Sequence, residues 1–399
     1  EPAAMTIEFE AQSYFQEKPG SSTANISGTG KGLSDRRGQR RVGLGKPGRP
    51  SGASESAVEA ALKWMARHQN YNGSWSFDHT IGGKCSGFAN PGDKQSRMGA
   101  TGLALLAFLG AGYTHTYESE YQENVRKGLK YLVDNMDQKT GRMFEVGGAN
   151  HEHMYCHGIA ACALAEAYGM TLDNRYKRLA QLGLDYIVAA QHPINGGWLY
   201  TPRAGGDTSV VGWQIMALKS GLLSYMSVPG KVGLLASRWL DSVQSEVPDY
   251  GGVGSRYGYR IAQDRQGRSG ACTAIGLLCR NYLGTPQDDA GLVAGVRWIS
   301  AQGPARADMY FNYYASMVMY QNDGKKGDMW IKWHDQIMNQ LVAAQVTADS
   351  DRGSWYFAAN HGDSGGRLYN TALACMTLEV PYRFMSVYKQ DSLEEFPLD

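Results

Sequence analysis

This sequence of 399 residues has little charge and no long apolar run. Charged residues make up 19% of the chain, against a usual share of about 25%. Low charge together with 43% hydrophobic residues excludes an intrinsically disordered protein and a long coiled coil. The apolar stretch at residues 101–112 is shorter than the roughly 20 residues that span a bilayer, so we expect no transmembrane segment. The composition favours a large packed core.

Several chemical signatures are missing as well. The six cysteines show no Cys-x-x-Cys spacing, and four of them fall in apolar helical patterns that are typical of buried free thiols. Disulfide pairing and redox compartment therefore stay open. No Gly-Lys-Ser/Thr phosphate loop follows the glycine pairs at 205–206, 251–252 and 365–366, which read as turns. We expect no cofactor.

The basic residues are concentrated near the start of the chain. Formal net charge is +1, yet residues 31–49 carry seven cations and one anion. Residues 1–53 are rich in Gly, Ser and Arg, with a loose alternation at residues 5–14 that favours one short strand. Alone, such an arm would be disordered. We expect it to dock on the body, on a neighbouring copy or on an anionic partner.

The chain begins with Glu1 and not with Met. One interpretation is a mature terminus left after removal of an export signal, which places the protein outside the cytoplasm; the other is a numbering boundary. We expect an extracytoplasmic location, periplasmic or at the cell surface, with the cytoplasm left open.

From Ser54 onward the sequence repeats itself. Each repeat has an amphipathic segment that ends at a glutamine, followed by a Gly-containing turn with an aromatic residue. Three pairs are Gln69 with Trp75, Gln191 with Trp198 and Gln345 with Trp355, and a fourth repeat at 239–253 has Gln244 followed by a Gly-Gly-Val turn. Weakened copies lie at 131–141 and 298–302.

Each turn is followed by a second, more apolar segment rich in Ala, Gly, Leu and Met. We expect inner helices at 97–113, 155–169, 208–225, 269–283, 309–321 and 367–380. Six helix pairs close into a double ring, so the predicted fold is an all-α (α/α)6 toroid. The Gln would bond backbone groups at the outer helix end, and the Trp would stack on it and fasten the next repeat. The predicted organisation is an arm at 1–53, the toroid at 54–388 and a tail at 389–399.

This Gln…Gly-x-Trp pattern resembles the repeats of squalene–hopene cyclase and of related proteins with prenyltransferase and squalene-oxidase repeats. The resemblance covers about residues 54–388 and implies a terpenoid-cyclase-like toroid in one domain. The motif is specific for architecture and weak for chemistry, because toroids of this kind serve unrelated functions.

In such a fold the pocket lies at the N-terminal ends of the inner helices, where the helix dipoles favour anionic groups. Asp207 also reads as a helix cap, and His157 and the tyrosines also read as core residues. The pocket candidates are Arg97, His157, Asp207, Tyr310, Tyr313, Arg367 and Tyr369.

The chemistry of the resembling families is not intact here. The Asp-x-Asp-Asp acid of terpene cyclases is absent, and the nearest match, Asp349-Ser-Asp351, reads as a polar turn. Where a protein prenyltransferase would have a zinc-binding cysteine this chain has Ser209, and Tyr369-Asn370 stands where the histidine would be. His151, His153 and His157 are the only dense set of metal-ligand types, but their spacing fits no structural zinc module, so we expect no metal.

These residues leave two functional hypotheses. The first is an extracytoplasmic binding or self-assembly module without cyclase activity, which forms a homo-oligomer through residues 1–53. The alternative is an enzyme with a central pocket that acts on a terpenoid or on an anionic polysaccharide. The body carries no nucleic-acid module, so we expect no nucleic-acid partner.

Overall fold

The computed structural model describes residues 33, 36, 44–81, 89–145, 152–245, 255–262, 270–358 and 361–383. Across these ranges the chain forms twelve helices and no strand. One set of helices is α5 (Gly52–Arg67), α7 (Gln122–Asn135), α9 (Asn174–Ala190), α11 (Gly230–Val243), α13 (Ala290–Gln302) and α15 (Asp328–Ala344). The other set is α6 (Arg97–Gly110), α8 (His153–Thr171), α10 (Thr208–Leu223), α12 (Gly270–Tyr282), α14 (Met309–Asp323) and α16 (His361–Arg383).

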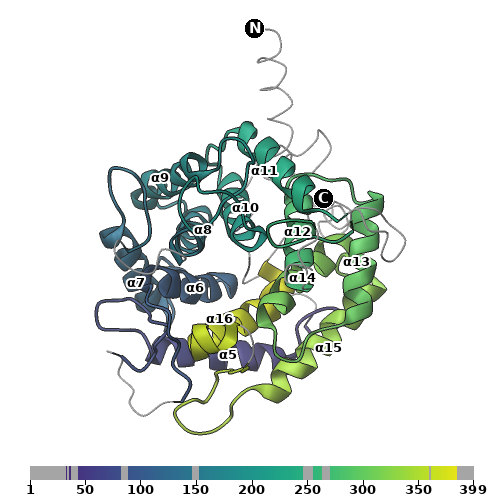
Figure 1. Cartoon of the computed structure of the whole chain (residues 1–399). Coiled ribbons are helices and arrows are strands. Elements are labelled where there is room, and N and C mark those ends of the chain that lie inside the picture. Colours follow the sequence, from purple (N-terminus) through teal and green to yellow (C-terminus); the bar gives the residue numbers. More distant parts are fainter. Residues whose placement is uncertain are drawn as a thin grey trace, which may run out of the picture.

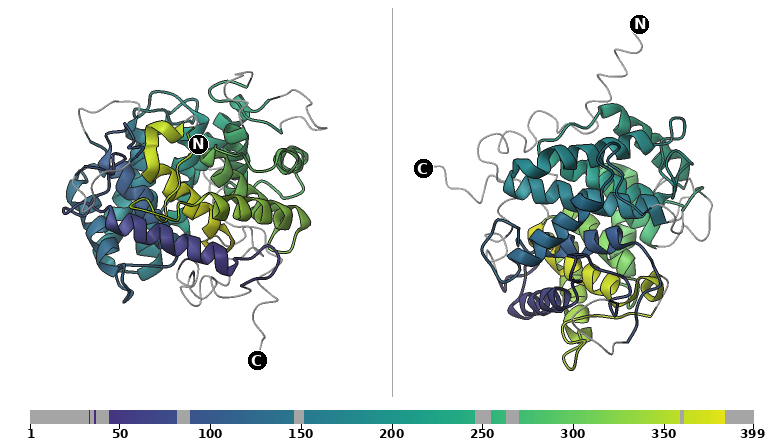
Figure 2. Two further views of the ribbon diagram at one scale, coloured as in Figure 1. Left: turned by 90° about the horizontal axis from the view of Figure 1, so that it is seen from below. Right: turned by 90° about the vertical axis from the view of Figure 1, so that its left-hand side faces the viewer.

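The second set forms a closed inner ring. Each inner helix packs on the next, and α16 returns to pack on α6. The first set of helices surrounds this inner ring. Figure 1 shows the arrangement with the inner helices at the centre, and Figure 2 shows it from two other sides. The predicted all-α (α/α)6 toroid is therefore confirmed.

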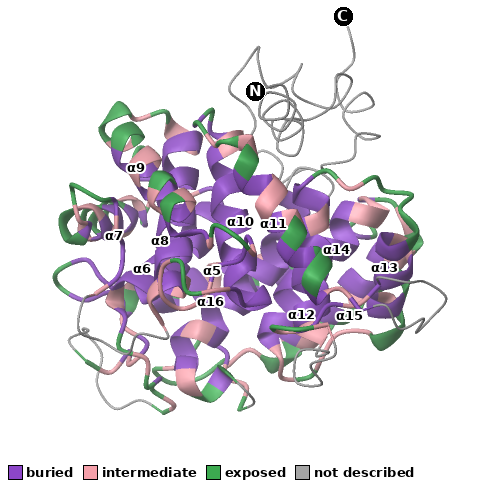
Figure 3. Cartoon of the chain, turned by 45° about the horizontal axis from the view of Figure 1, so that its top comes forward, coloured by how far each residue is buried: buried purple, intermediate pink, exposed green. Residues whose placement is uncertain are grey.

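Burial separates the two sets of helices, and Figure 3 shows it by colour. Outer helix α7 buries Val125, Gly128, Leu129 and Leu132, which form one stripe at helical spacing. Inner helix α8 is buried on every side, with no exposed position from residue 156 to residue 169. Inner helices therefore need small and apolar residues all round.

The Gln and Trp of each clear repeat have separate hydrogen bonds. Gln69 Nε2 donates to the carbonyl oxygens of Gly73 and Asn124, each at 2.9 Å, so it joins its own turn to the next outer helix, α7. Trp75 Nε1 donates back to the Met65 carbonyl oxygen at 2.8 Å. The same bonds recur at Gln191 with Trp198 and at Gln345 with Trp355. The Gln amide thus connects consecutive repeats by hydrogen bonds, and the Trp75 ring also lies against Gly128 of α7, where an added Cβ would be 2.9 Å from it.

Two of the differences between predicted and observed boundaries have a clear physical cause. Helix α5 begins at Gly52, two residues before the predicted start of the repeats, because the Ser51 hydroxyl accepts the Ser54 amide and caps it. Helix α16 begins at His361 but breaks at Gly366, where φ is 63° and the backbone of Gly92 comes close. The predicted start at Arg367 is the first residue after that break.

Within the arm, Leu33 and Arg36 are described and both are buried against the ring of their own chain. Farther along, the Gly48 carbonyl oxygen accepts Trp330 Nε1 of α15 at 3.0 Å. The predicted strand at 5–14 and the tail at 389–399 lie outside the described residues. None of the described helices is both long and apolar enough to cross a membrane.

Candidate functional site

Three hydroxyl groups from three inner helices meet at the N-terminal end of the ring. Tyr155 in the first turn of α8 donates its hydroxyl proton to Ser209 Oγ at 2.6 Å. Ser209, the second residue of α10, donates in turn to the Tyr310 hydroxyl of α14 at 3.1 Å. We call Tyr155, Ser209 and Tyr310 the hydroxyl cluster. Such a meeting requires that the three helices begin at the same level around the ring.

Asp207 lies directly beside this cluster as the N-cap of α10. Its Oδ1 accepts the backbone amides of Ser209 at 2.8 Å and Val210 at 3.2 Å. The hydroxyls of Tyr200 and Tyr259 are hydrogen-bonded to each other next to the same carboxyl group. Burial raises the pKa of Asp207, against the opposing effect of these phenols and amides. The carboxyl group therefore takes up a proton more readily than an exposed aspartate.

The floor below the hydroxyl cluster is aromatic. Tyr314 contacts Tyr310 edge to face with ring centroids 5.0 Å apart, and Trp213 stacks on Tyr313 at 6.3 Å. Trp213, Tyr313 and Tyr314 are at most 2% exposed, so side chains fill the ring at this level.

The rim above the floor is partly open to solvent. Tyr155, Tyr200, Tyr259 and Tyr369 are all partly exposed there. Exposed Arg260 lies over the rings of Tyr200 and Tyr259, at 5.4 and 5.5 Å from their centroids. A ligand at this entrance would meet phenol rings, hydroxyl groups and one guanidinium.

Of the predicted pocket residues, the structure brings Asp207, Tyr310 and Tyr369 to this entrance. Tyr313 lies one helical turn deeper, fully buried in the floor. Asp207 combines the two interpretations that the sequence allowed, since it caps α10 and also faces the tyrosines.

His157 faces away from the ring axis. Its Nδ1 accepts the Met143 amide at 3.1 Å and its Nε2 donates to the Gly183 carbonyl oxygen of outer helix α9 at 2.9 Å. Burial lowers its pKa to about 4. His157 is thus a neutral core histidine between an inner and an outer helix, and the pocket role considered for it is not supported by these contacts.

The two predicted arginines also lie elsewhere. Arg367 forms an ion pair with Asp351 at 3.1 Å and donates to Ser354 Oγ at 3.0 Å, which holds the turn before α16. Arg97 is near Tyr131 of outer helix α7, where its charge opposes the rise in pKa that burial gives this phenol. Neither arginine contacts the hydroxyl cluster.

The predicted metal candidates are dispersed. His153 stacks on Phe144 with ring centroids 4.3 Å apart, His157 is bonded as above, and His151 lies outside the described residues. In the part of the chain that the structure describes, no three His, Cys, Asp or Glu residues are grouped to hold a metal ion.

Sequence reasoning missed Tyr155, Tyr200 and Tyr259, and treated Ser209 only as a lost zinc ligand. The sequence did contain one indication of the cluster: inner helices α8, α10 and α14 each have a Tyr or Ser within their first three positions. Tyr200 and Tyr259 lie in loops, where no periodic pattern indicates a direction.

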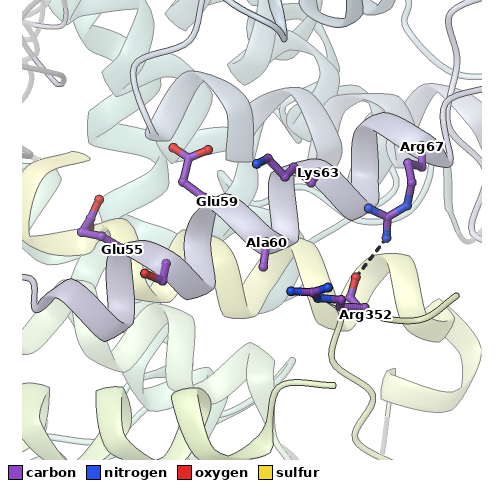
Figure 4. A pocket seen from close by; sticks show the side chains of 7 residues that line it. Glu55, Glu59, Ala60, Lys63, Arg67 and Arg352 are labelled. Atoms are coloured by element: carbon purple, nitrogen blue, oxygen red, sulfur yellow. Dashed lines mark hydrogen bonds between the residues drawn. The ribbon is translucent and has the colours of Figure 1, made fainter. Parts of the chain in front are cut away.

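A groove lies outside the ring, along the partly exposed face of α5 (Figure 4). This groove encloses about 600 Å³ and is lined by Glu55, Glu59, Lys63, Arg67 and Arg352, among others. Glu59 accepts the hydroxyls of Tyr113 and Tyr121 at 2.7 and 3.2 Å, and Arg67 donates to the Arg352 carbonyl oxygen at 3.0 Å. Glu59 and Arg67 thus serve contacts within the fold, and we place the candidate site at the ring entrance, where side chains from three inner helices meet.

No protein-family profile and no curated protein sequence matches the chain. Among solved structures, cellobiose 2-epimerase of Bacillus thermoamylovorans is similar with a TM-score of 0.56 and 13% identity over 82% of this chain and 97% of that one. An α-1,6-mannanase variant of Salegentibacter in complex with α-1,6-mannotriose has a TM-score of 0.55 and 12% identity over 82% and 99%. A type II terpene cyclase variant of Scytonema in complex with geranylgeranyl dihydroxybenzoate has a TM-score of 0.50 and 13% identity over 83% and 97%. At such identities the likeness shows the α/α toroid alone.

Proposed function

We propose that the chain binds a neutral saccharide at the inner-ring entrance. The observation that carries this proposal is the hydroxyl cluster of Tyr155, Ser209 and Tyr310, drawn from three helices and placed beside Asp207. A sugar presents many hydroxyl groups and an apolar ring face. Phenol hydroxyls that both donate and accept, set among partly exposed aromatic rings, match both features.

The entrance fits a neutral sugar better than the two ligands that the sequence suggested. A terpenoid needs a deep apolar cavity, but Trp213, Tyr313 and Tyr314 fill the ring below the cluster. An anionic polysaccharide needs several cations, whereas among the residues that the structure describes Arg367 is paired with Asp351 and Arg260 is the arginine seen over the rings of this rim. A mannanase with mannotriose and a cellobiose epimerase share the fold, and so does a terpene cyclase, so the choice of a saccharide rests on the side chains at the entrance.

The test is a calorimetric titration of the full chain with α-1,6-mannotriose, cellobiose and a geranylgeranyl phenol. We expect binding of at least one saccharide, and a loss of about fivefold to tenfold in affinity for Tyr155→Phe, which removes one neutral hydrogen bond. Tyr225→Phe, beyond the C-terminal end of α10, is the matched control and should bind like the unchanged chain. Product analysis of the same mixtures separates an enzyme from a binding protein.

Tight binding of the geranylgeranyl phenol with no binding of either saccharide would overturn the proposal. So would saccharide binding that Tyr155→Phe and Tyr225→Phe leave equally unchanged. The self-assembly hypothesis stays a prediction, and the described arm residues contact the ring of their own chain.

A further inference from the structure

The opposite end of the inner ring holds four buried charges that the entrance does not use. Glu166 of α8 pairs with Arg36 of the arm at 2.7 Å and with Arg383 of α16 at 3.2 Å. Arg383 also pairs with Glu379 of the same helix at 3.4 Å. All four residues are at most 3% exposed. Among the residues that the structure describes, two cations and two anions meet there, and one of the cations, Arg36, comes from outside the ring.

The Arg36 guanidinium donates to acceptors on several helices of the ring. Nη1 donates to Glu166 Oε2 at 2.7 Å and to the Leu109 carbonyl oxygen of α6 at 3.1 Å. Nε donates to the Arg383 carbonyl oxygen, at the last residue of α16, at 3.2 Å. Carbonyl groups at helix C-termini attract cations, and the planar guanidinium reaches several acceptors at once, which an ammonium group does not.

A second contact accompanies the guanidinium. Leu33 and Arg36 are both helical and stand three positions apart, so they share one face of a turn. Leu33 is 5% exposed and packs over Gly169 near the end of α8, where an added Cβ would lie 2.8 Å from Leu33 Cδ1. The ring thus offers a notch for a leucine beside an acidic site for an arginine.

We propose that the C-terminal end of the inner ring is a binding site for a helical turn with Leu and Arg three residues apart, and that Leu33 and Arg36 of the arm fill it as an intramolecular latch. Two observations support this. The acceptors belong to three different helices, α6, α8 and α16, and Gly169 leaves room for both Ser224 and Leu33, which an added Cβ would meet at 2.1 and 2.8 Å. The arm of a second copy carries the same Leu and Arg, so it could bind this site only after the arm of the first copy has left it.

The test uses the full-length Arg36→Gly chain and a fluorescent peptide of residues 29–41. We expect the peptide to bind this variant one to one, and the unchanged chain at least tenfold more weakly, because its site is filled. A peptide with Arg36→Lys should bind the variant at least tenfold more weakly than the native peptide, although its charge is the same. Equal binding to both chains, or no binding to a folded variant, would contradict the proposal.

Chemical rescue keeps the proposal testable if Arg36→Gly folds poorly. Millimolar guanidinium chloride should raise the melting temperature of the full-length Arg36→Ala chain, whose shortened side chain leaves the acceptors open, and leave the unchanged chain unaffected, with sodium chloride at equal ionic strength as the control. No rescue would count against the guanidinium site. Light scattering tests whether the latch is intramolecular. A molar mass of the unchanged chain that rises with protein concentration, and that stays at the monomer value in Arg36→Gly, would show that arms are exchanged between copies and would contradict this part of the proposal.

Discussion

At the scale of single residues, His157 shows how the ring keeps a buried titratable group neutral. Its Nδ1 accepts the Met143 amide, so the proton must be on Nε2, which donates to Gly183. A second proton would break the Met143 bond and place a charge between two helices. Burial accordingly lowers the pKa of His157 from 6.5 to about 4.

This pKa predicts a stability change in acid. Because the folded pKa is below the unfolded value of 6.5, the contribution is complete above that pH and is lost as pH falls from 6.5 through about 4. The full loss amounts to about 3 kcal/mol, at about 1.4 kcal/mol per pH unit. In urea unfolding at several pH values, His157→Gln should reduce the dependence of the unfolding free energy on pH across this range. Exposed His361→Gln is the control, and equal slopes in all three chains would refute the prediction.

Asp207 allows its capping role to be separated from its charge. Asp207→Ala removes both amide bonds at the start of α10 and should cost about 1–2 kcal/mol in unfolding free energy. Asp207→Asn keeps a carbonyl oxygen that accepts the same amides, so we expect a loss below about 0.5 kcal/mol. Asp289→Ala, at the exposed start of α13, loses a single amide bond and should cost less than Asp207→Ala. If Asn costs as much as Ala at position 207, the charge and not the cap stabilises the entrance.

At the scale of elements, the connection between repeats depends on one glutamine amide. Gln191 Nε2 donates to the Gly196 carbonyl oxygen at 2.8 Å and to the Val232 carbonyl oxygen of α11 at 3.0 Å. Gln191→Ala loses both bonds and should lower the unfolding free energy by about 2 kcal/mol. Gln191→Glu should cost at least as much, because a carboxylate would face two carbonyl oxygens without a proton to donate.

The same comparison applies to Gln345, which makes the equivalent pair of bonds to Gly353 and Ala57. Thermal unfolding of the Ala and Glu variants at both positions provides the measurement. A Glu variant as stable as the unchanged chain would show that these amides are dispensable.

The helices themselves were predictable from the sequence, whereas the directions of inner-helix side chains were not. Five of the six predicted inner helices start within two residues of the observed ones, because each is a small-residue apolar run after a Gly-containing turn. On α8, however, burial continues on every side, so no stripe tells whether His157 faces the axis or an outer helix. Only the packing of α9 decides this.

Contacts between distant residues were equally hidden. Arg36 and Glu166 are 130 positions apart, and the hydroxyl cluster joins Ser209 to Tyr310 across 101 positions. Each pairing depends on which helix lies next to which around the ring. A sequence pattern with a helical period does not say which helices are neighbours. The basic arm was therefore predicted to dock, but the residues that accept it were not identified.

At the scale of the whole molecule, the ring is closed by its last inner helix. Helix α16 packs on α14, on α6 and on outer helix α5, and Gln345 Nε2 donates to the Ala57 carbonyl oxygen of α5 at 2.8 Å. The beginning and the end of the toroid are thus neighbours. In an open array, a weakened repeat disturbs only the repeats beside it. In a closed ring, every repeat has two neighbours, so a fault at the seam should be felt by all of them.

Gly110 tests this closure because it lies at the seam between α6 and α16. An added Cβ would collide with the Glu379 carboxylate and the Arg383 guanidinium, both fully or almost fully buried. Gly110→Ala should therefore lower the unfolding free energy by about 2–3 kcal/mol. Gly52→Ala, where nothing lies within 4 Å of the added Cβ, is the matched control and should be neutral or slightly stabilising.

Tryptophan fluorescence and far-ultraviolet circular dichroism should show the same shifted midpoint for Gly110→Ala, since a closed ring loses stability as one unit. Two separate transitions would show instead that the repeats unfold independently and that closure couples them weakly.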